Sequence, residues 1–82
     1  MIKKLSELMK ESGISGLKTY KIVENEMYKA VNVIGYVQQN DKWIIYNFDE
    51  RCQMSICNEY DSEQDAVDGL FKIIKTFYSL GR

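Results

Sequence analysis

The sequence predicts a single α+β domain over residues 1–82, in the order α-β-β-β-(β)-α, with an antiparallel sheet and both helices packed on one of its faces. Apolar residues recur at helical spacing near both ends of the chain. Between them lie runs rich in β-branched and aromatic residues, separated by turn-forming pairs. Hydrophobic residues make up 45% of the chain and charged residues 28%, which is the balance of a folded globular domain.

The first predicted element is a short helix over residues 2–12. Its apolar residues follow helical spacing: Ile2, Leu5, Leu8 and Met9. Gly13 is placed to end this helix, and Ile14 is the apolar residue that often follows such an end.

Three strands are predicted in the middle of the chain, over residues 17–24, 28–39 and 42–48. Asn25 and Glu26 indicate a turn after the first strand, and Asn40-Asp41 indicates a hairpin between the second and the third. The third strand is apolar on both faces, so we expect its second face to be covered or to become a contact surface. A further strand over residues 51–58 would turn three residues inward: Cys52, Met54 and Ile56.

The C-terminal helix has the strongest pattern. Ser62 is a good N-cap, Asp65 stands three residues further on, and Gly81 can close the helix. Its apolar stripe runs from Ala66 to Tyr78. The residues that we expect in the core are Leu5, Leu8, Val33, Leu70, Ile73, Ile74 and Phe77.

The composition argues against catalysis. The chain has no histidine, which is the commonest general base and metal ligand, and it has no glycine-rich phosphate loop. Cys52 and Cys57 are five positions apart, so on a regular strand they would point to opposite faces. We therefore expect reduced cysteines, no metal, no cofactor and no enzymatic activity.

No apolar run is long enough for a signal peptide or a membrane span. We therefore expect a cytoplasmic protein that does not interact with membranes. The sequence leaves its oligomeric state open.

The charges are uneven along the chain. Seven carboxylates and one arginine lie between residues 49 and 68, for a local net charge of −6, although the whole chain carries −1. Acids at a helix start and in a loop are common, which accounts for some of them. The remainder predict a surface that attracts a basic protein. The predicted partner-binding residues are Tyr46, Phe48, Asp49, Glu50, Arg51, Glu59 and Asp61, with the aromatic rings as anchors and Arg51 as a possible ion-pair partner of Asp49 or Glu50.

Two sequence features bear on nucleic-acid binding. Trp43, Tyr46 and Phe48 could stack on bases, although core packing is the more frequent role of such residues. The α-β-β-β-α order also resembles a double-stranded RNA-binding domain, in which lysines at the start of the second helix grip phosphates. Here that start reads SEQDAVD, and its three acids would repel a phosphate backbone. We therefore expect no binding to nucleic acid.

A second resemblance rests on residues 42–75. Trp43-Ile44-Ile45-Tyr46 is followed by Glu50-Arg51, and then by Ser62-Glu63 and Ala66 at the start of a helix. This order resembles the small immunity proteins of bacterial polymorphic-toxin and contact-dependent growth inhibition systems. In their pattern a glycine commonly follows Glu-Arg, whereas Cys52 stands there in this sequence.

The resemblance implies a non-catalytic protein that binds a cognate toxin domain and blocks its active site or substrate groove. Many such toxins are nucleases with basic grooves, for which an acidic binder is suited. The alternatives are a nucleic-acid-binding or regulatory αβββα module and a phage-encoded inhibitor that mimics nucleic acid.

Overall fold

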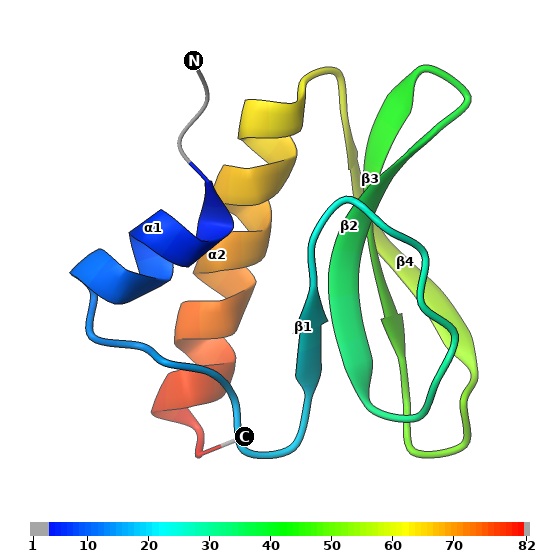
Figure 1. Cartoon of the computed structure of the whole chain (residues 1–82). Coiled ribbons are helices and arrows are strands. Elements are labelled where there is room, and N and C mark those ends of the chain that lie inside the picture. The colour runs from blue at the N-terminus through cyan, green and yellow to red at the C-terminus, as the bar shows by residue number, and fades with distance from the viewer. Residues whose placement is uncertain (1–3, 82) are drawn as a thin grey trace.

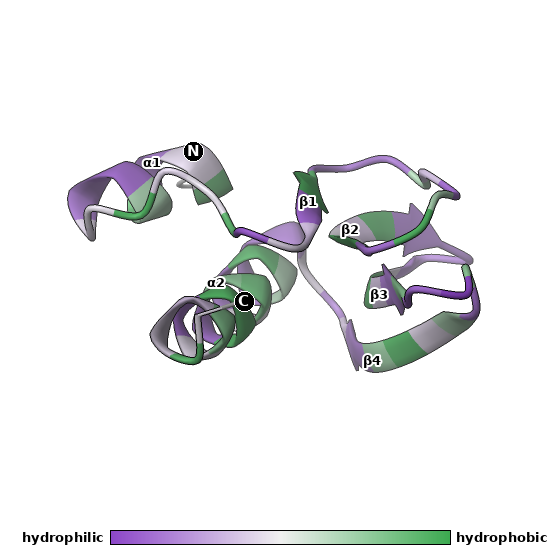
Figure 2. Cartoon of the chain, turned by 90° about the horizontal axis from the view of Figure 1, so that it is seen from below, coloured by the Kyte–Doolittle hydropathy of each residue, from purple (hydrophilic) through white to green (hydrophobic). Residues whose placement is uncertain are grey.

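A computed structural model describes residues 4–81 and contains two helices and four strands. Along the chain these are α1 (Leu5–Glu11), β1 (Lys21–Val23), β2 (Val33–Gln39), β3 (Lys42–Phe48), β4 (Met54–Tyr60) and α2 (Glu63–Ser79). The predicted α+β class, the order of the elements and the placement of both helices on one side of the sheet are confirmed (Figure 1). Seen from below, the sheet is one layer and the helices lie along its left side (Figure 2).

The end of α1 and the start of α2 lie at the residues that the sequence predicts for them. Gly13 adopts φ 74°, and the amide of Ile14 donates to the carbonyl of Met9 at 2.9 Å, so the chain turns away after α1. Ile2, which the predicted helix included, lies outside the described residues. At the start of α2, the Ser62 hydroxyl accepts a hydrogen bond from the Asp65 amide at 3.1 Å, as the capping prediction requires.

The sheet is mixed, and in this respect the prediction of an antiparallel sheet is wrong. The strand order is β1-β2-β3-β4. β2, β3 and β4 are antiparallel neighbours, whereas β1 pairs with β2 in parallel. β1 and β2 are also shorter than the predicted strands, because residues 24–32 leave the sheet and form a crossover loop between them.

The hairpin between β2 and β3 forms where predicted. Asn40 has φ 52° and Asp41 has φ 65°, so both central residues of the turn are in the left-handed region. This conformation matches the twist of the two strands, and Asn and Asp tolerate it better than most residues. The hairpin fixes the register of β2 on β3, with Gly35 opposite Tyr46 and Tyr36 opposite Ile45.

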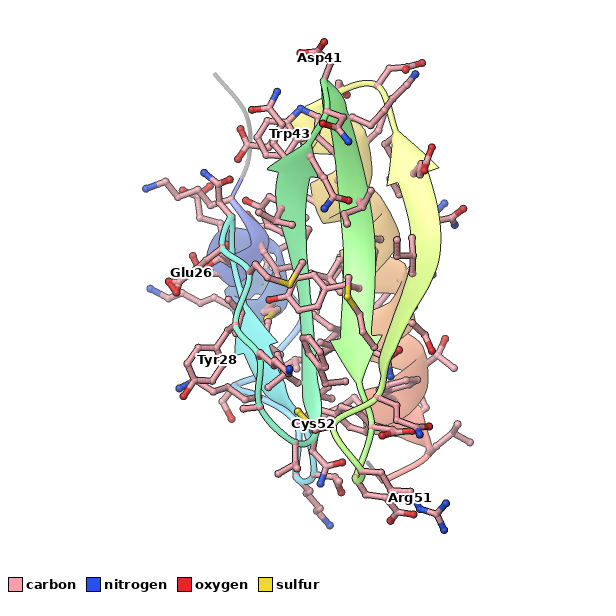
Figure 3. All side chains as sticks on the ribbon, turned by 90° about the vertical axis from the view of Figure 1, so that its right-hand side faces the viewer. Glu26, Tyr28, Asp41, Trp43, Arg51 and Cys52 are labelled. Atoms are coloured by element: carbon pink, nitrogen blue, oxygen red, sulfur yellow. The ribbon has the colours of Figure 1, made fainter. Side chains whose placement is uncertain are left out.

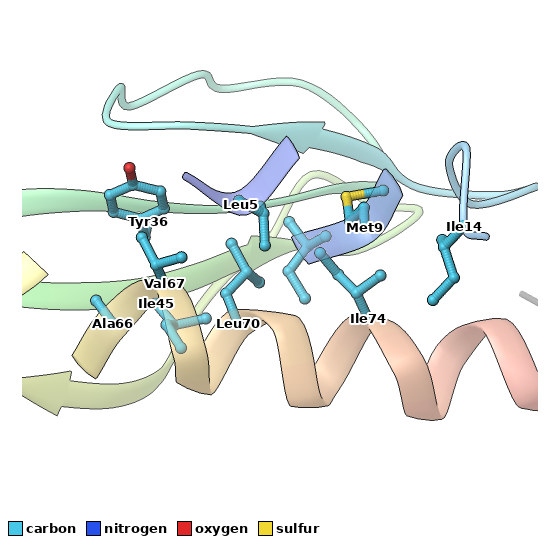
Figure 4. Close-up of a cluster of buried hydrophobic side chains, with 10 residues drawn as sticks. Leu5, Met9, Ile14, Tyr36, Ile45, Ala66, Val67, Leu70 and Ile74 are labelled. Carbon is cyan, nitrogen blue, oxygen red and sulfur yellow. The ribbon is translucent and has the colours of Figure 1, made fainter. Parts of the chain in front are cut away.

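The sheet buries apolar side chains on both faces. The helix side of the sheet packs on both helices, and the buried residues of this main core include Leu5, Ile34, Ile45, Leu70 and Ile74 (Figure 4). The opposite face, which we call the outer face, carries a second, smaller core of four residues: Val23, Val33, Tyr46 and Phe48. The expectation that the second face of residues 42–48 needs a cover is therefore confirmed.

Most of the predicted core is confirmed, but β4 differs from its prediction. Leu5, Val33, Leu70 and Ile74 are buried, and the other three predicted core residues are partly buried against the main core: Leu8, Ile73 and Phe77. In β4, Met54 is 42% exposed and Ile56 is 52% exposed, so the prediction that they face inward is wrong. β4 is the last strand of the sheet, and little of the protein covers it.

Candidate protein-binding surface

The acids of residues 49–68 lie at two ends of the sheet. Asp49 and Glu50 precede β4, whereas Glu59 and Asp61 lie at or just after its end. β4 has seven residues, so about 20 Å separates the two groups. Figure 3 shows the two ends, with Arg51 and Cys52 at the bottom and Asp41 at the top. The seven predicted site residues therefore do not form one continuous patch.

The end that holds the hairpin and the start of α2 is the more acidic, and we call it the acidic end. Its carboxylates come from five segments of the fold: Glu24, Asp41, Glu59, Asp61, and Glu63 with Asp65. Lys42 lies among them and forms an ion pair with Asp61, which lowers the pKa of that carboxyl. Glu59 and Asp61 both favour the charged form of Lys42 and raise its pKa, with the hydrogen bond to Asp61 as the largest cause.

Tyr36 links the acidic end to the core. Its ring is buried against the main core, while its hydroxyl donates to Glu63 Oε2 at 3.1 Å. Burial is the largest cause that raises the pKa of Tyr36, and the negative charges of Glu63 and Glu24 raise it further. The hydroxyl therefore stays protonated and orients the Glu63 carboxylate at the start of α2.

At the opposite end, Asp49 has a structural role. Its Oδ1 accepts hydrogen bonds from the amides of Arg51 at 2.8 Å and Gln53 at 2.9 Å, and these bonds close the turn into β4. The bond from Gln53 is the largest cause that lowers the pKa of Asp49. No ion pair joins Arg51 to Asp49 or Glu50 among the described residues, so the expected structural ion pair is absent there.

Tyr46 and Phe48 do not lie on the surface. Tyr46 is 0% exposed and Phe48 is 4% exposed, and their rings meet edge to face with centroids 5.8 Å apart. The prediction that they anchor a partner is therefore wrong for this structure. The reason is the crossover loop: the Tyr46 hydroxyl donates to the carbonyl of Glu26 at 2.7 Å and accepts from the amide of Tyr28 at 3.0 Å.

Gly35 permits this contact. A Cβ atom at Gly35 would lie 2.5 Å from the carbonyl oxygen of Val23 and 3.0 Å from the Tyr46 hydroxyl, so a side chain would displace both β1 and the ring. The absence of a side chain lets Tyr46 extend across β2 and reach the crossover loop, which then covers part of the outer face (Figure 3).

Apolar side chains nevertheless remain exposed on the outer face. Ile56 pairs with Tyr46, and Met54 pairs with Phe48, so both lie beside the second core on the same face. The crossover loop adds three more exposed apolar side chains, from Met27, Tyr28 and Val31. Apolar contact with a partner is therefore available one strand away from the predicted anchors, on β4.

A groove separates β4 from α2. It has a volume of about 640 Å³, and its walls are Asn58 and Tyr60 on β4 and five residues of α2: Asp65, Asp68, Gly69, Lys72 and Ile73. A Cβ atom at Gly69 would lie 2.2 Å from the Tyr60 hydroxyl, so this glycine leaves the space that the Tyr60 ring occupies. The five helical residues are spaced to lie on one face of α2.

The cysteines occupy different environments. Cys52 lies in the turn before β4 and packs against the second core, whereas Cys57 lies on β4 and is exposed. Partial burial of its sulfur raises the pKa of the Cys57 thiol, which disfavours the reactive thiolate. Within residues 4–81, no three metal-ligating side chains of the types His, Cys, Asp and Glu gather at one point. In the same part of the chain, no helix has the length and apolar character to cross a bilayer.

Sequence reasoning missed Glu24 and Asp41 as members of the acidic end. Asp41 could have been predicted from the sequence, because the turn between β2 and β3 lies at the same end of the sheet as the C-terminal end of β4, which is antiparallel to β3. Glu24 gave no such signal, since its place depends on the parallel pairing of β1. Comparison with protein-family models, with curated proteins and with solved structures finds no match for the chain.

Proposed function

We propose that the chain is a non-catalytic immunity protein that binds a bacterial toxin domain with a basic face and neutralises it in the cytoplasm. The observation that carries the proposal is the acidic end, where Glu59 and Asp61 act on Lys42 and further carboxylates of the hairpin and of the start of α2 lie at the same end of the sheet. Such a concentration of one charge accelerates encounter with a partner of opposite charge and disfavours partners of like charge.

The protonation behaviour of the carboxyls supports a binding role. Asp49 and Asp61 both have a lowered pKa, because hydrogen bonds stabilise their charged forms. A carboxyl that acts as a general acid near neutral pH needs a raised pKa instead. A charged Asp61 at the acidic end suits electrostatic steering of a basic partner.

The turn before β4 supports the resemblance to immunity proteins. Cys52 stands where their pattern commonly has glycine, and its φ is 59°, in the left-handed region that glycine adopts without strain. The backbone therefore takes a conformation here that a glycine would adopt without strain, although the residue is a cysteine.

Binding to nucleic acid is the less supported alternative. Glu63 and Asp65 lie in the first turn of α2, where a double-stranded RNA-binding domain would place lysines. These acids repel phosphates, which proteins bind mainly through Lys and Arg. We therefore expect no binding to duplex RNA or DNA, even at low salt.

The decisive experiment uses the toxin domain encoded immediately upstream of this chain. Coexpression should restore growth, and the purified chain should bind that domain and inhibit it. Glu59→Lys should slow association and flatten its salt dependence, because it reverses a charge at the acidic end. Glu50→Lys is the matched control: it makes the same charge change on another exposed residue, about 20 Å away along β4.

Two results would contradict the proposal. One is an upstream product that is not toxic, or that kills cells equally with and without this chain. The other is an association rate that Glu59→Lys and Glu50→Lys lower by the same factor, which would exclude the acidic end as the site of encounter.

A further inference from the structure

β4 leaves one long strand edge without a partner. It is the terminal strand of the sheet and pairs with β3 on one side only. All seven of its residues are exposed or half-buried, none is Pro, and Glu59 is the one charged residue among them. Proteins usually protect such an edge with prolines, charged residues or a short strand. β1, the other terminal strand, is protected by length, since it has only three residues.

A bulge divides this edge into two parts. Ile56 pairs with Tyr46 and Asn58 pairs with Ile45, so Cys57 is the extra residue between them. The bulge interrupts regular pairing at Cys57, and the part that follows, Asn58–Tyr60, borders the groove along α2. A strand added to this part would therefore have β4 on one side and the helix on the other.

The dimensions of the groove suit a short extended segment. Its helical wall runs from Asp65 to Ile73, which is about 12 Å along the helix axis. An extended chain advances about 3.3 Å per residue, so four residues span this length. Tyr60 provides an apolar ring in the wall, and Ile73 is half-buried there.

Charge selects the kind of segment. Asp65 and Asp68 lie in the helical wall, Glu59 and Asp61 lie on or just after β4, and Lys72 is the single cation among the residues that line the groove. Asp61 is already paired with Lys42, whereas the other three carboxylates form no ion pair within the described residues. Lys or Arg side chains on the α2 side of an added strand would meet Asp65 and Asp68.

We propose that an extended, basic segment of a partner protein pairs with the free edge of β4 at Asn58–Tyr60 and lies in the groove against α2. This inference deepens the proposed function, on which it rests, by naming the element of the partner that is bound. Main-chain hydrogen bonds to β4 provide affinity, and the carboxylates provide selectivity for alternate basic side chains. A second copy of this chain fits less well, because its own β4 carries Glu59 and no cation.

The test uses a synthetic six-residue peptide that alternates Lys or Arg with Val, and it needs no toxin. The ¹⁵N-labelled chain is titrated with this peptide, with the same peptide N-methylated at alternate residues, and with a version that has Glu in place of each Lys and Arg. Amide shifts should concentrate at residues 57–61 and 65–73. N-methylation removes donors to β4 and should weaken binding about tenfold or more, and the Glu peptide should not bind.

Two variants of the chain complete the test. Asp65→Lys should weaken binding of the basic peptide about fivefold or more, while Glu50→Lys should change it less than twofold. The Asp65 side chain is not part of the Ser62 cap, which uses the Asp65 backbone amide, so the helix start should persist. Equal binding of the N-methylated peptide, or shifts that spread over all acidic residues, would overturn strand pairing.

Sedimentation without peptide tests the alternative occupant. A dimer whose formation shifts the β4 amides would overturn the inference in favour of self-association, and a monomer is the expected result. The peptide titration and the sedimentation measurement do not depend on the result of the growth assay. A chain that neutralises the toxin but fails the peptide titration would refute the strand-pairing mode alone.

Discussion

Tyr46→Phe tests whether one hydroxyl holds the crossover loop on the outer face. The substitution keeps the ring, which is fully buried, and removes the oxygen that bonds to Glu26 and Tyr28. Each hydrogen bond contributes about 0.5–1.5 kcal/mol net, so the two together contribute about 1–3 kcal/mol. Tyr28 is 41% exposed, and water can replace part of the loss at its amide. We therefore expect a decrease of about 1–2 kcal/mol in the free energy of unfolding.

Urea denaturation measures this change, and amide exchange locates it. The amides of residues 24–32 should exchange faster in the variant, while those of α2 should change only through the global stability. Tyr60→Phe is the matched control. Among the described residues, the Tyr60 hydroxyl accepts a hydrogen bond only from the exposed side-chain amide of Asn58, so this substitution should lower the free energy of unfolding by less than about 0.5 kcal/mol. If Tyr46→Phe costs no more than Tyr60→Phe and leaves the loop amides unchanged, the hydroxyl does not hold the loop.

Three further predictions follow from burial, backbone conformation and pKa. In chemical denaturation, Leu70→Ala should cost roughly 2–5 kcal/mol because Leu70 is fully buried, whereas Ile56→Ala should cost under about 1 kcal/mol because Ile56 is 52% exposed; similar losses would contradict the burial. Cys52→Gly should be more stable to urea than Cys52→Ala, with a free energy of unfolding about 1 kcal/mol higher, since only glycine is unstrained at φ 59°; the reverse order would show that the turn relaxes. Burial raises the pKa of Tyr36 and Tyr46, so the stability that their neutral forms contribute is complete below pH about 10 and is lost as the pH rises above it; a urea midpoint that stays constant from pH 9 to 11 would contradict this.

The features that the sequence predicted correctly depend on neighbours in the chain. The cap at Ser62, the end of α1 at Gly13 and the hairpin at Asn40-Asp41 each require only a few adjacent residues. The apolar stripe of α2 likewise follows from helical spacing. Such signals fix the elements and their order, which is why the α+β class could be read from the sequence.

The features that were missed depend on contacts between distant segments. The parallel pairing of β1 requires the crossover loop to run back across the outer face, and the Tyr46 hydroxyl bonds to residues 18 and 20 positions away. No short pattern marks these contacts. The only sequence signal was indirect: an apolar second face on residues 42–48 required a cover, without indicating which segment provides it.

The same contacts explain why the acidic residues had to be regrouped. The block of acids is continuous in the sequence, but β4 runs through it. Glu59 near the end of β4 and Asp61 just after it therefore lie about 20 Å from Glu50, which precedes the strand. The hairpin and the parallel β1 then bring Asp41 and Glu24 to the acidic end, from outside the block. Charge density along the sequence thus identified a charged surface but not its members. The direction and order of the strands decide which carboxylates lie together, so these two features of the fold determine the charged surface.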